Sequence, residues 1–328
     1  MTLLRAALDR LRPHPHRGDV IAAGAVPLAL AAVVIELRMT QWSLGPRFVV
    51  VALVASLLFL MGWLAPLEGE TPRTYHSVLL LAGLLPMVVA LTLLAEILGA
   101  HRPPGAGGDV WIFGLEAALA AAAAWRANSG VCTLVAALAG AIAVEAFVQW
   151  VFAPHGVGTF RAISVVLTLG FAAGAVRLRD RWGRHAVQLI NAGGVVTVVL
   201  AGSFLLGAAL RGFANSALVS FGSTGVAGGA GWGWRLWVLA VGFGLIAFAC
   251  ADREPGPAYL GVLLLVEFAV LVGAAPSGRG SLVGWPLFLL VIGAIGMIVG
   301  LRPRRPLPPP PGSEAGAAPT VPLNREDR

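Results

Sequence analysis

Charged side chains are scarce in this 328-residue chain, which has 12% charged residues against 58% hydrophobic ones. Soluble domains have about 25% charged residues and need them to cover their surface. The shortage therefore excludes a soluble globular protein. Lysine is absent altogether, so all 23 basic residues are arginines. Together with 42 glycines, this usage suggests a GC-rich genome, and we expect a bacterial plasma-membrane protein.

Cysteines are few, and the common catalytic motifs are missing. We expect Cys132 and Cys250, the two cysteines, at cytoplasmic helix ends, where thiols stay reduced. The sequence contains no HExxH, CxxC or paired-histidine pattern for a metal. It also has no GxSxG elbow or kinase signature, and its six histidines lie outside the predicted membrane spans. We therefore expect no enzyme activity, no cofactor and no metal.

Long apolar runs dominate what is present. Most of them have about 17 to 25 residues, which is long enough to cross a bilayer as a helix. The sequence thus predicts an all-α, polytopic transmembrane helix bundle of about ten spans with both termini cytoplasmic. The fourth run is the weakest, because it is alanine-rich and carries Glu116. The predicted spans are 20–36, 48–66, 77–99, 110–125, 131–152, 162–177, 186–210, 234–251, 258–275 and 282–301.

Arginines at the ends of the spans predict the orientation. Four of them crowd the polar gap at 175–185, and such a loop stays cytoplasmic. With ten spans, fourteen arginines lie in or beside the inside segments and seven in the outside ones. The ten tryptophans lie in loops or near span ends, at the interfacial level that indoles prefer. Because the positive charge gathers at span ends, the net charge of +7 does not predict a nucleic-acid partner.

Three regions follow from this layout. The sequence of residues 1–18 is basic and amphipathic, and it predicts a cytoplasmic segment that lies on the membrane surface. Residues 19–301 form the ten-helix transmembrane domain, with an outside glycine-rich loop at 212–233. Residues 302–328 are proline-rich and predict a disordered cytoplasmic tail. Within the domain, the GxxxG spacing of Gly170 and Gly174 predicts close packing inside the bundle.

Carboxylates inside the spans are the candidate site. A charge at mid-helix costs about 2.5–3.5 kcal/mol on insertion scales, so such residues face a cavity or a partner. Spans four and five predict an antiparallel hairpin that places Glu116 and Glu145 at matched depth, about 9 and 10 Å from the outer face. We expect at least one of them to keep its proton at neutral pH. The candidate intramembrane polar site comprises Glu116, Glu145, Gln149, Arg161 as a counter-charge, and Glu267.

Two functions remain open. The first is a non-enzymatic scaffold or accessory membrane subunit with a membrane-protein partner, in which the glutamates, Glu36 and Glu96 included, are protonated or paired with outer arginines. The second is a small-solute transporter, because ten spans divide into two inverted halves of five, as in several secondary transporters. Both functions place the chain in contact with the lipid bilayer.

Overall fold

The protein is seen here in a computed structural model, which describes residues 13, 17–39, 41–67, 72–154, 156–216, 231–273 and 291. Within these residues it is all-helical, with nine helices long and apolar enough to cross a membrane. The helices are α2 (Gly18–Arg38), α3 (Leu44–Leu64), α4 (Thr74–Ile97), α5 (Ala106–Ala127), α6 (Gly130–Phe152), α7 (Val157–Leu178), α8 (Gly183–Ser216), α9 (Trp232–Asp252) and α10 (Pro255–Gly273).

These nine helices confirm the first nine predicted spans one by one. The predicted tenth span, the N-terminal segment before α2 and the proline-rich tail lie outside the described residues, apart from a few positions. Helix ends differ from the prediction by a few residues. Two histidines are therefore inside helices rather than in loops, because α4 and α8 each begin three residues earlier than expected and include His76 and His185.

Helix α5 shows how an alanine-rich run becomes a span. Alanine is the strongest helix former, and the run continues without interruption to Ala127. Asn128 then takes a left-handed backbone conformation with φ 49°, and its N–H bonds the carbonyl of Ala124. A left-handed residue of this kind ends many helices, and here it turns the chain directly into α6.

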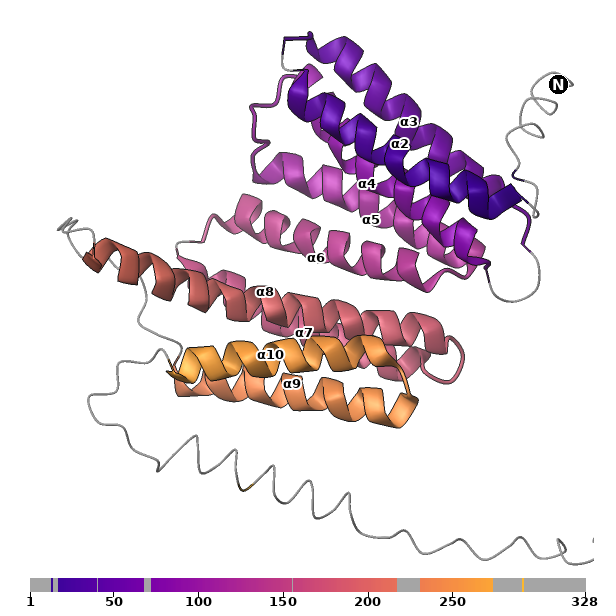
Figure 1. Ribbon diagram of the computed structural model, residues 1–328. Coiled ribbons are helices and arrows are strands. Elements are labelled where there is room, and N and C mark those ends of the chain that lie inside the picture. The colour runs from indigo at the N-terminus through magenta and orange to yellow at the C-terminus, as the bar shows by residue number, and fades with distance from the viewer. Residues whose placement is uncertain are drawn as a thin grey trace, which may run out of the picture. The chain divides into compact units, whose positions relative to one another are not determined.

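Consecutive helices pack as antiparallel hairpins (Figure 1). The pairs α3–α4, α5–α6, α7–α8 and α9–α10 have the most extensive contacts, while α2 packs on α4, and α8 packs on both α6 and α10. Two glycines allow the tightest approaches. A Cβ on Gly83 would lie 2.5 Å from the backbone nitrogen of Phe59, and one on Gly261 would lie 2.7 Å from the carbonyl oxygen of Gly242.

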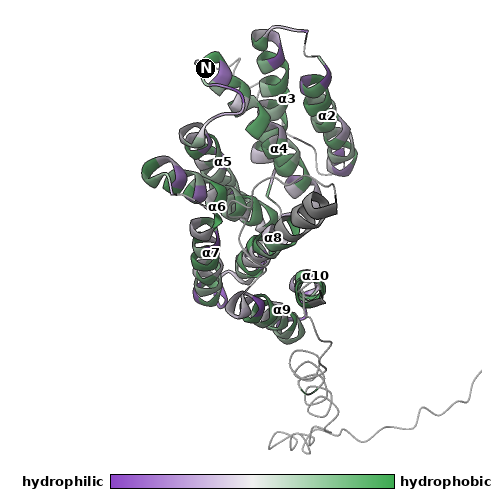
Figure 2. Cartoon of the chain, turned by 90° about the vertical axis from the view of Figure 1, so that its left-hand side faces the viewer, coloured by the Kyte–Doolittle hydropathy of each residue, from purple (hydrophilic) through white to green (hydrophobic). Residues whose placement is uncertain are grey.

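The helices consist mostly of hydrophobic residues, as Figure 2 shows by hydropathy, and many of these residues face outward. Large hydrophobic side chains stand largely exposed there, among them Leu30, Val166 and Val176. Water would penalise such a surface by about 25 cal/mol for each Å², whereas lipid tails do not. The chain is therefore a multi-pass membrane protein in contact with a lipid bilayer.

The hairpin arrangement gives the described helices two ends that hold different numbers of arginines. We call the end that holds the α5–α6, α7–α8 and α9–α10 connections the basic end, and the other the opposite end. The arginines with described side chains at the basic end are Arg17, Arg73, Arg126, Arg177, Arg179, Arg181, Arg184 and Arg253; those at the opposite end are Arg38, Arg47, Arg102, Arg161 and Arg235.

A candidate carboxylate cavity

The sequence-predicted residue with the most polar surroundings is Glu145 of α6. The hydroxyl of Ser164, on α7, lies 3.1 Å from its Oε1 and can donate a hydrogen bond to it. Ser164 is almost completely buried. The hydroxyl also lies 2.9 Å from the carbonyl oxygen of Phe160 on its own helix, so its single proton is shared between that acceptor and Glu145 on the neighbouring helix.

Glu145 also lines a cavity of about 460 Å³ between the start of α5, the last turns of α6 and the start of α7. Its other polar side chains are Asp109, Gln149 and Thr159, and the remaining lining is apolar. Asp109 is the fourth residue of α5, and Gln149 lies three residues before the end of α6. The cavity thus lies near the opposite end of the helices, with two carboxyl groups and no arginine in its lining.

Glu116 belongs to another part of the structure. It is 2% exposed, and it shares one face of α5 with Ile112 and Ala120, four residues on either side. Those neighbours belong to clusters with Leu91 and Leu84 of α4, so this face of α5 is turned to α4. Oε2 of Glu116 is buried without a hydrogen-bond partner among the described residues, and Glu116 is not part of the cavity lining.

The depth expected for Glu116 needs correction. Helix α5 begins at Ala106, four residues earlier than predicted, so Glu116 lies ten residues along it, about 15 Å at the α-helical rise. Glu145 lies seven residues before the end of α6 at Phe152, or about 10 Å from that end. The α5–α6 hairpin is as predicted, but the two carboxyls differ in depth by about 5 Å and have different neighbours.

The two remaining predicted residues also lie apart from the cavity. The guanidinium of Arg161 stands 3.6 Å above the ring of Phe204 on α8, a cation–π arrangement. No ion pair joins it to a carboxylate among the described residues. Glu267 of α10 is half-buried, and its Oε2 has no hydrogen-bond partner in the described part of the chain. The structure therefore brings together Glu145 and Gln149, and leaves Glu116, Arg161 and Glu267 elsewhere.

A row of hydroxyl groups continues from Glu145 into the bundle, and the sequence reasoning missed it. One turn beyond Ser164, the hydroxyl of Thr168 donates to the Ser164 carbonyl at 2.8 Å. The Thr168 hydroxyl lies 3.2 Å from that of Thr197 on α8, which donates to the carbonyl of Gly193 at 2.9 Å. The signal was the four-residue spacing of Ser164 and Thr168 in an apolar helix, which places both hydroxyls on one face.

Asp109 was missed for a simpler reason. Since the fourth span was predicted to begin at residue 110, Asp109 counted as a loop residue, whereas the helix begins at Ala106. An acidic residue in the first turn of a helix also stabilises the positive end of its dipole, so Asp109 has a structural reason to be there. Its place in the cavity lining became visible only with the helix packing.

No protein-family model matches the chain, and no curated protein matches it.

Proposed function

We propose that this multi-pass membrane protein transports a small cationic solute, or couples solute movement to protons, through the cavity lined by Asp109, Glu145 and Gln149. One observation carries the proposal. The cavity holds two carboxyl groups and two neutral polar side chains, and no basic residue lines it. Intramembrane carboxylates typically mark ion paths and proton relays.

The charge balance selects cations over anions. A carboxylate in a partly enclosed, low-dielectric site attracts a positive charge much more strongly than it would in water. An anion would meet repulsion from both Asp109 and Glu145 without an arginine to offset it. The volume of about 460 Å³ lies within the range of about 300–1,000 Å³ usual for small-molecule sites.

The hydroxyl row supports a path from the cavity toward the middle of the bundle. Ser164 contacts Glu145, and Thr168, one turn away, lines a second cavity of about 350 Å³ between α7, α8 and α9. Gly193 and Gly194 also line this second cavity. The contacts that join different helices along this path are Ser164 with Glu145 and Thr168 with Thr197, and an alternating-access cycle would have to break and remake them.

Reconstitution of the purified protein into liposomes tests the proposal. The liposomes hold a pH-sensitive dye, and a potassium gradient with valinomycin sets the membrane potential. The dye reports proton entry while sodium, tetramethylammonium or ethidium is present in the outer buffer. We expect flux above that of protein-free liposomes, reduced at least about tenfold by Glu145→Gln, which keeps the shape of the side chain and removes its charge.

Glu267→Gln is the matched control, because it removes another intramembrane carboxylate that lies outside the cavity. It should leave the flux unchanged, while Asp109→Asn should give an intermediate loss. Equal flux from wild type and Glu145→Gln would overturn the proposal. The non-enzymatic scaffold function would be favoured by a different result. In that case the wild-type flux equals that of protein-free liposomes with all three cations, and none of the cations raises the melting temperature of the protein.

A further inference from the structure

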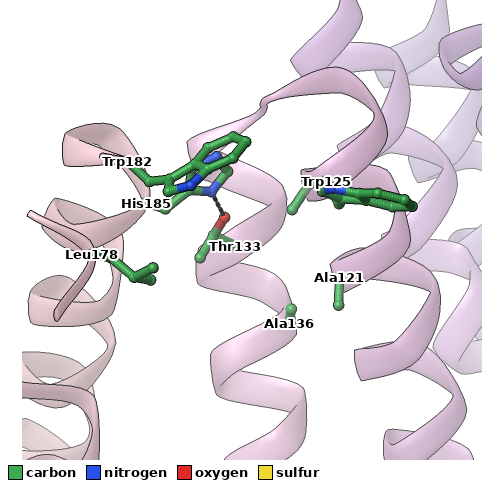
Figure 3. A pocket seen from close by; sticks show the side chains of 8 residues that line it. Ala121, Trp125, Thr133, Ala136, Leu178, Trp182 and His185 are labelled. Atoms are coloured by element: carbon green, nitrogen blue, oxygen red, sulfur yellow. Dashed lines mark hydrogen bonds between the residues drawn. The ribbon is translucent and has the colours of Figure 1, made fainter. Parts of the chain in front are cut away.

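A third cavity, remote from Glu145, lies at the basic end. This groove of about 250 Å³ lies between the α5–α6 hairpin and the α7–α8 connection. Its lining is Ala121, Ala124, Trp125, Thr133, Ala136, Leu178, Trp182 and His185. Figure 3 shows the indoles of Trp125 and Trp182 on either side of Thr133, with Ala121 and Ala136 farther from the α5–α6 turn.

Small side chains create the groove. Three alanines from α5 and α6 form much of its lining, together with Leu178 of α7. Alanines at these positions leave a space that larger residues would fill. The facing helices therefore enclose an apolar groove. Its volume is just below the range of about 300–1,000 Å³ of small-molecule sites, so the groove fits a segment of acyl chain and not a whole lipid.

Hydrogen bonds around His185 hold the two sides of the groove in place. The Nε2 of His185 lies 2.8 Å from Oδ1 of Asn128, and its Nδ1 contacts the hydroxyl of Thr133. These partners belong to the α5–α6 turn and to the start of α6, whereas His185 is on α8. The width of the groove is therefore set by side chains that connect the two hairpins.

The two tryptophans place the mouth of the groove at the level of lipid headgroups. Trp125 is 80% exposed and Trp182 is 40% exposed, although both side chains are large and apolar. Indoles favour the membrane–water interface, and between the two indoles the lining is mostly apolar, with Leu178 and three alanines. The occupant of the groove thus enters from the bilayer.

Positive charge predominates around this mouth, since the stretch 177–185 holds four arginines and a single acidic residue, Asp180. Arg126 follows Trp125 directly, while Arg181 and Arg184 flank Trp182; all three are exposed. None of them forms an ion pair with another described residue, in contrast to Arg179, which contacts Asp252. Basic clusters between transmembrane helices attract anionic lipid headgroups.

We propose that this groove is a binding site for an anionic phospholipid. One acyl chain lies along Ala121, Ala124 and Ala136, and the headgroup phosphate is bound by Arg181 and Arg184, with Arg126 on the other side. Trp125 and Trp182 border the glycerol region. The site is independent of the carboxylate cavity and does not rest on the proposed transport.

Lipid binding to the purified full-length protein tests the site. Phosphatidylglycerol and phosphatidylcholine with identical chains are added to the delipidated protein in detergent, and bound lipid is counted by native mass spectrometry. We expect phosphatidylglycerol to bind at least about tenfold more tightly. The double variant Arg181→Gln/Arg184→Gln should lose about tenfold in affinity for phosphatidylglycerol, and Arg253→Gln, which removes an exposed arginine at the basic end outside the groove, should not.

A second variant tests the groove separately from the charge. Ala136→Phe fills the groove while every arginine stays in place, so phosphatidylglycerol binding should fall. Glycerol 3-phosphate, which has no acyl chain, should not displace the lipid from the wild-type protein. Melting curves in plain detergent confirm that each variant is folded. Equal binding of the two lipids, or equal affinity in the double variant and Arg253→Gln, would overturn the proposal. Unchanged binding in Ala136→Phe would overturn the acyl-chain part of the site.

Discussion

Arg47 of α3 holds the carboxylate of Glu36 of α2 inside the bundle. Its Nε lies 2.8 Å from Oε2 of Glu36, a terminal nitrogen contacts Oε1, and the same nitrogen lies 3.3 Å from the Glu36 carbonyl oxygen. The residues are 5% and 3% exposed. Arg102, which is largely exposed, adds a contact of 3.0 Å to Glu36 and one of 3.2 Å to Glu96. The ends of α2, α3 and α4 are thus joined at one point.

Removal of Arg47 should strongly destabilise the protein. The variant Arg47→Met keeps the apolar stem but leaves the buried Glu36 without its main partner, which costs about 3–5 kcal/mol for pairs of this kind. The free energy of unfolding in detergent, measured by titration with a denaturing detergent, should fall by about this amount.

Arg102→Gln is the matched control for this pair. Because its side chain is 52% exposed, solvent screens the contact, and the loss should be at most about 1 kcal/mol. The double variant Glu36→Gln/Arg47→Met should regain part of the stability lost in the single variant, since no charge is then left buried alone. A loss in Arg102→Gln as large as that in Arg47→Met would contradict this account.

The sequence predicted the existence of these contacts better than their geometry. Glu36 and Glu96 lie near the outer ends of predicted spans, and pairing with outer arginines was one of the alternatives for them; the structure confirms the contacts with arginines, while the outward orientation stays a prediction. The choice of Arg47 for Glu36 depends on how α2 and α3 pack. Helix positions could be predicted from apolar runs alone, because membrane insertion depends on local hydrophobicity. Contacts between helices that are distant in the sequence cannot be predicted in this way.

Glycine packing illustrates the same limit. The expectation that Gly170 packs inside the bundle is wrong, because a Cβ there would meet nothing within 4 Å, and only Gly174 comes close to Leu189. The tightest approaches to the backbone of a neighbouring helix occur at Gly83 and Gly261, which no spacing pattern singled out. In a chain with 42 glycines, a GxxxG spacing arises readily by chance.

These glycines give a second prediction. Gly83→Ala places a methyl group against the backbone of Phe59 on α3, which cannot move without separating the α3–α4 hairpin. We expect a loss of about 1–3 kcal/mol in the free energy of unfolding. Gly170→Ala has open space and a better helix former, so it should leave stability unchanged or raise it by up to about 1 kcal/mol. Equal stability of both variants would show that α3 and α4 are not so close.

Orientation is a third prediction. The arginine distribution predicts that the basic end and both termini are cytoplasmic and that the loop at 212–233 is outside. Cys132 is buried and Cys250 exposed, so the background is first reduced with Cys250→Ala. Single cysteines at Ser223 and Ser313, both outside the described residues, are then exposed to an impermeant thiol reagent in intact cells. Position 223 should react; labelling at 313 would refute the orientation.

The last prediction contrasts the buried carboxylates Glu36 and Glu116. They are 3% and 2% exposed, but Glu36 contacts two arginines, whereas Oε2 of Glu116 has no hydrogen-bond partner among the described residues. Glu116 lies near the middle of α5, where an isolated polar group is costly in a membrane. A methionine of similar length would fill the same space against α4 without that cost.

We therefore expect Glu116→Met to keep or raise the free energy of unfolding, by up to about 3 kcal/mol. Glu36→Met should lower it, because Arg47 is then left buried without a carboxylate. Cation flux in liposomes should also survive Glu116→Met, since this side chain does not line the Glu145 cavity. If the variant folds normally but abolishes flux while Glu145→Gln does not, the transport site lies at the α4–α5 face and not in the carboxylate cavity.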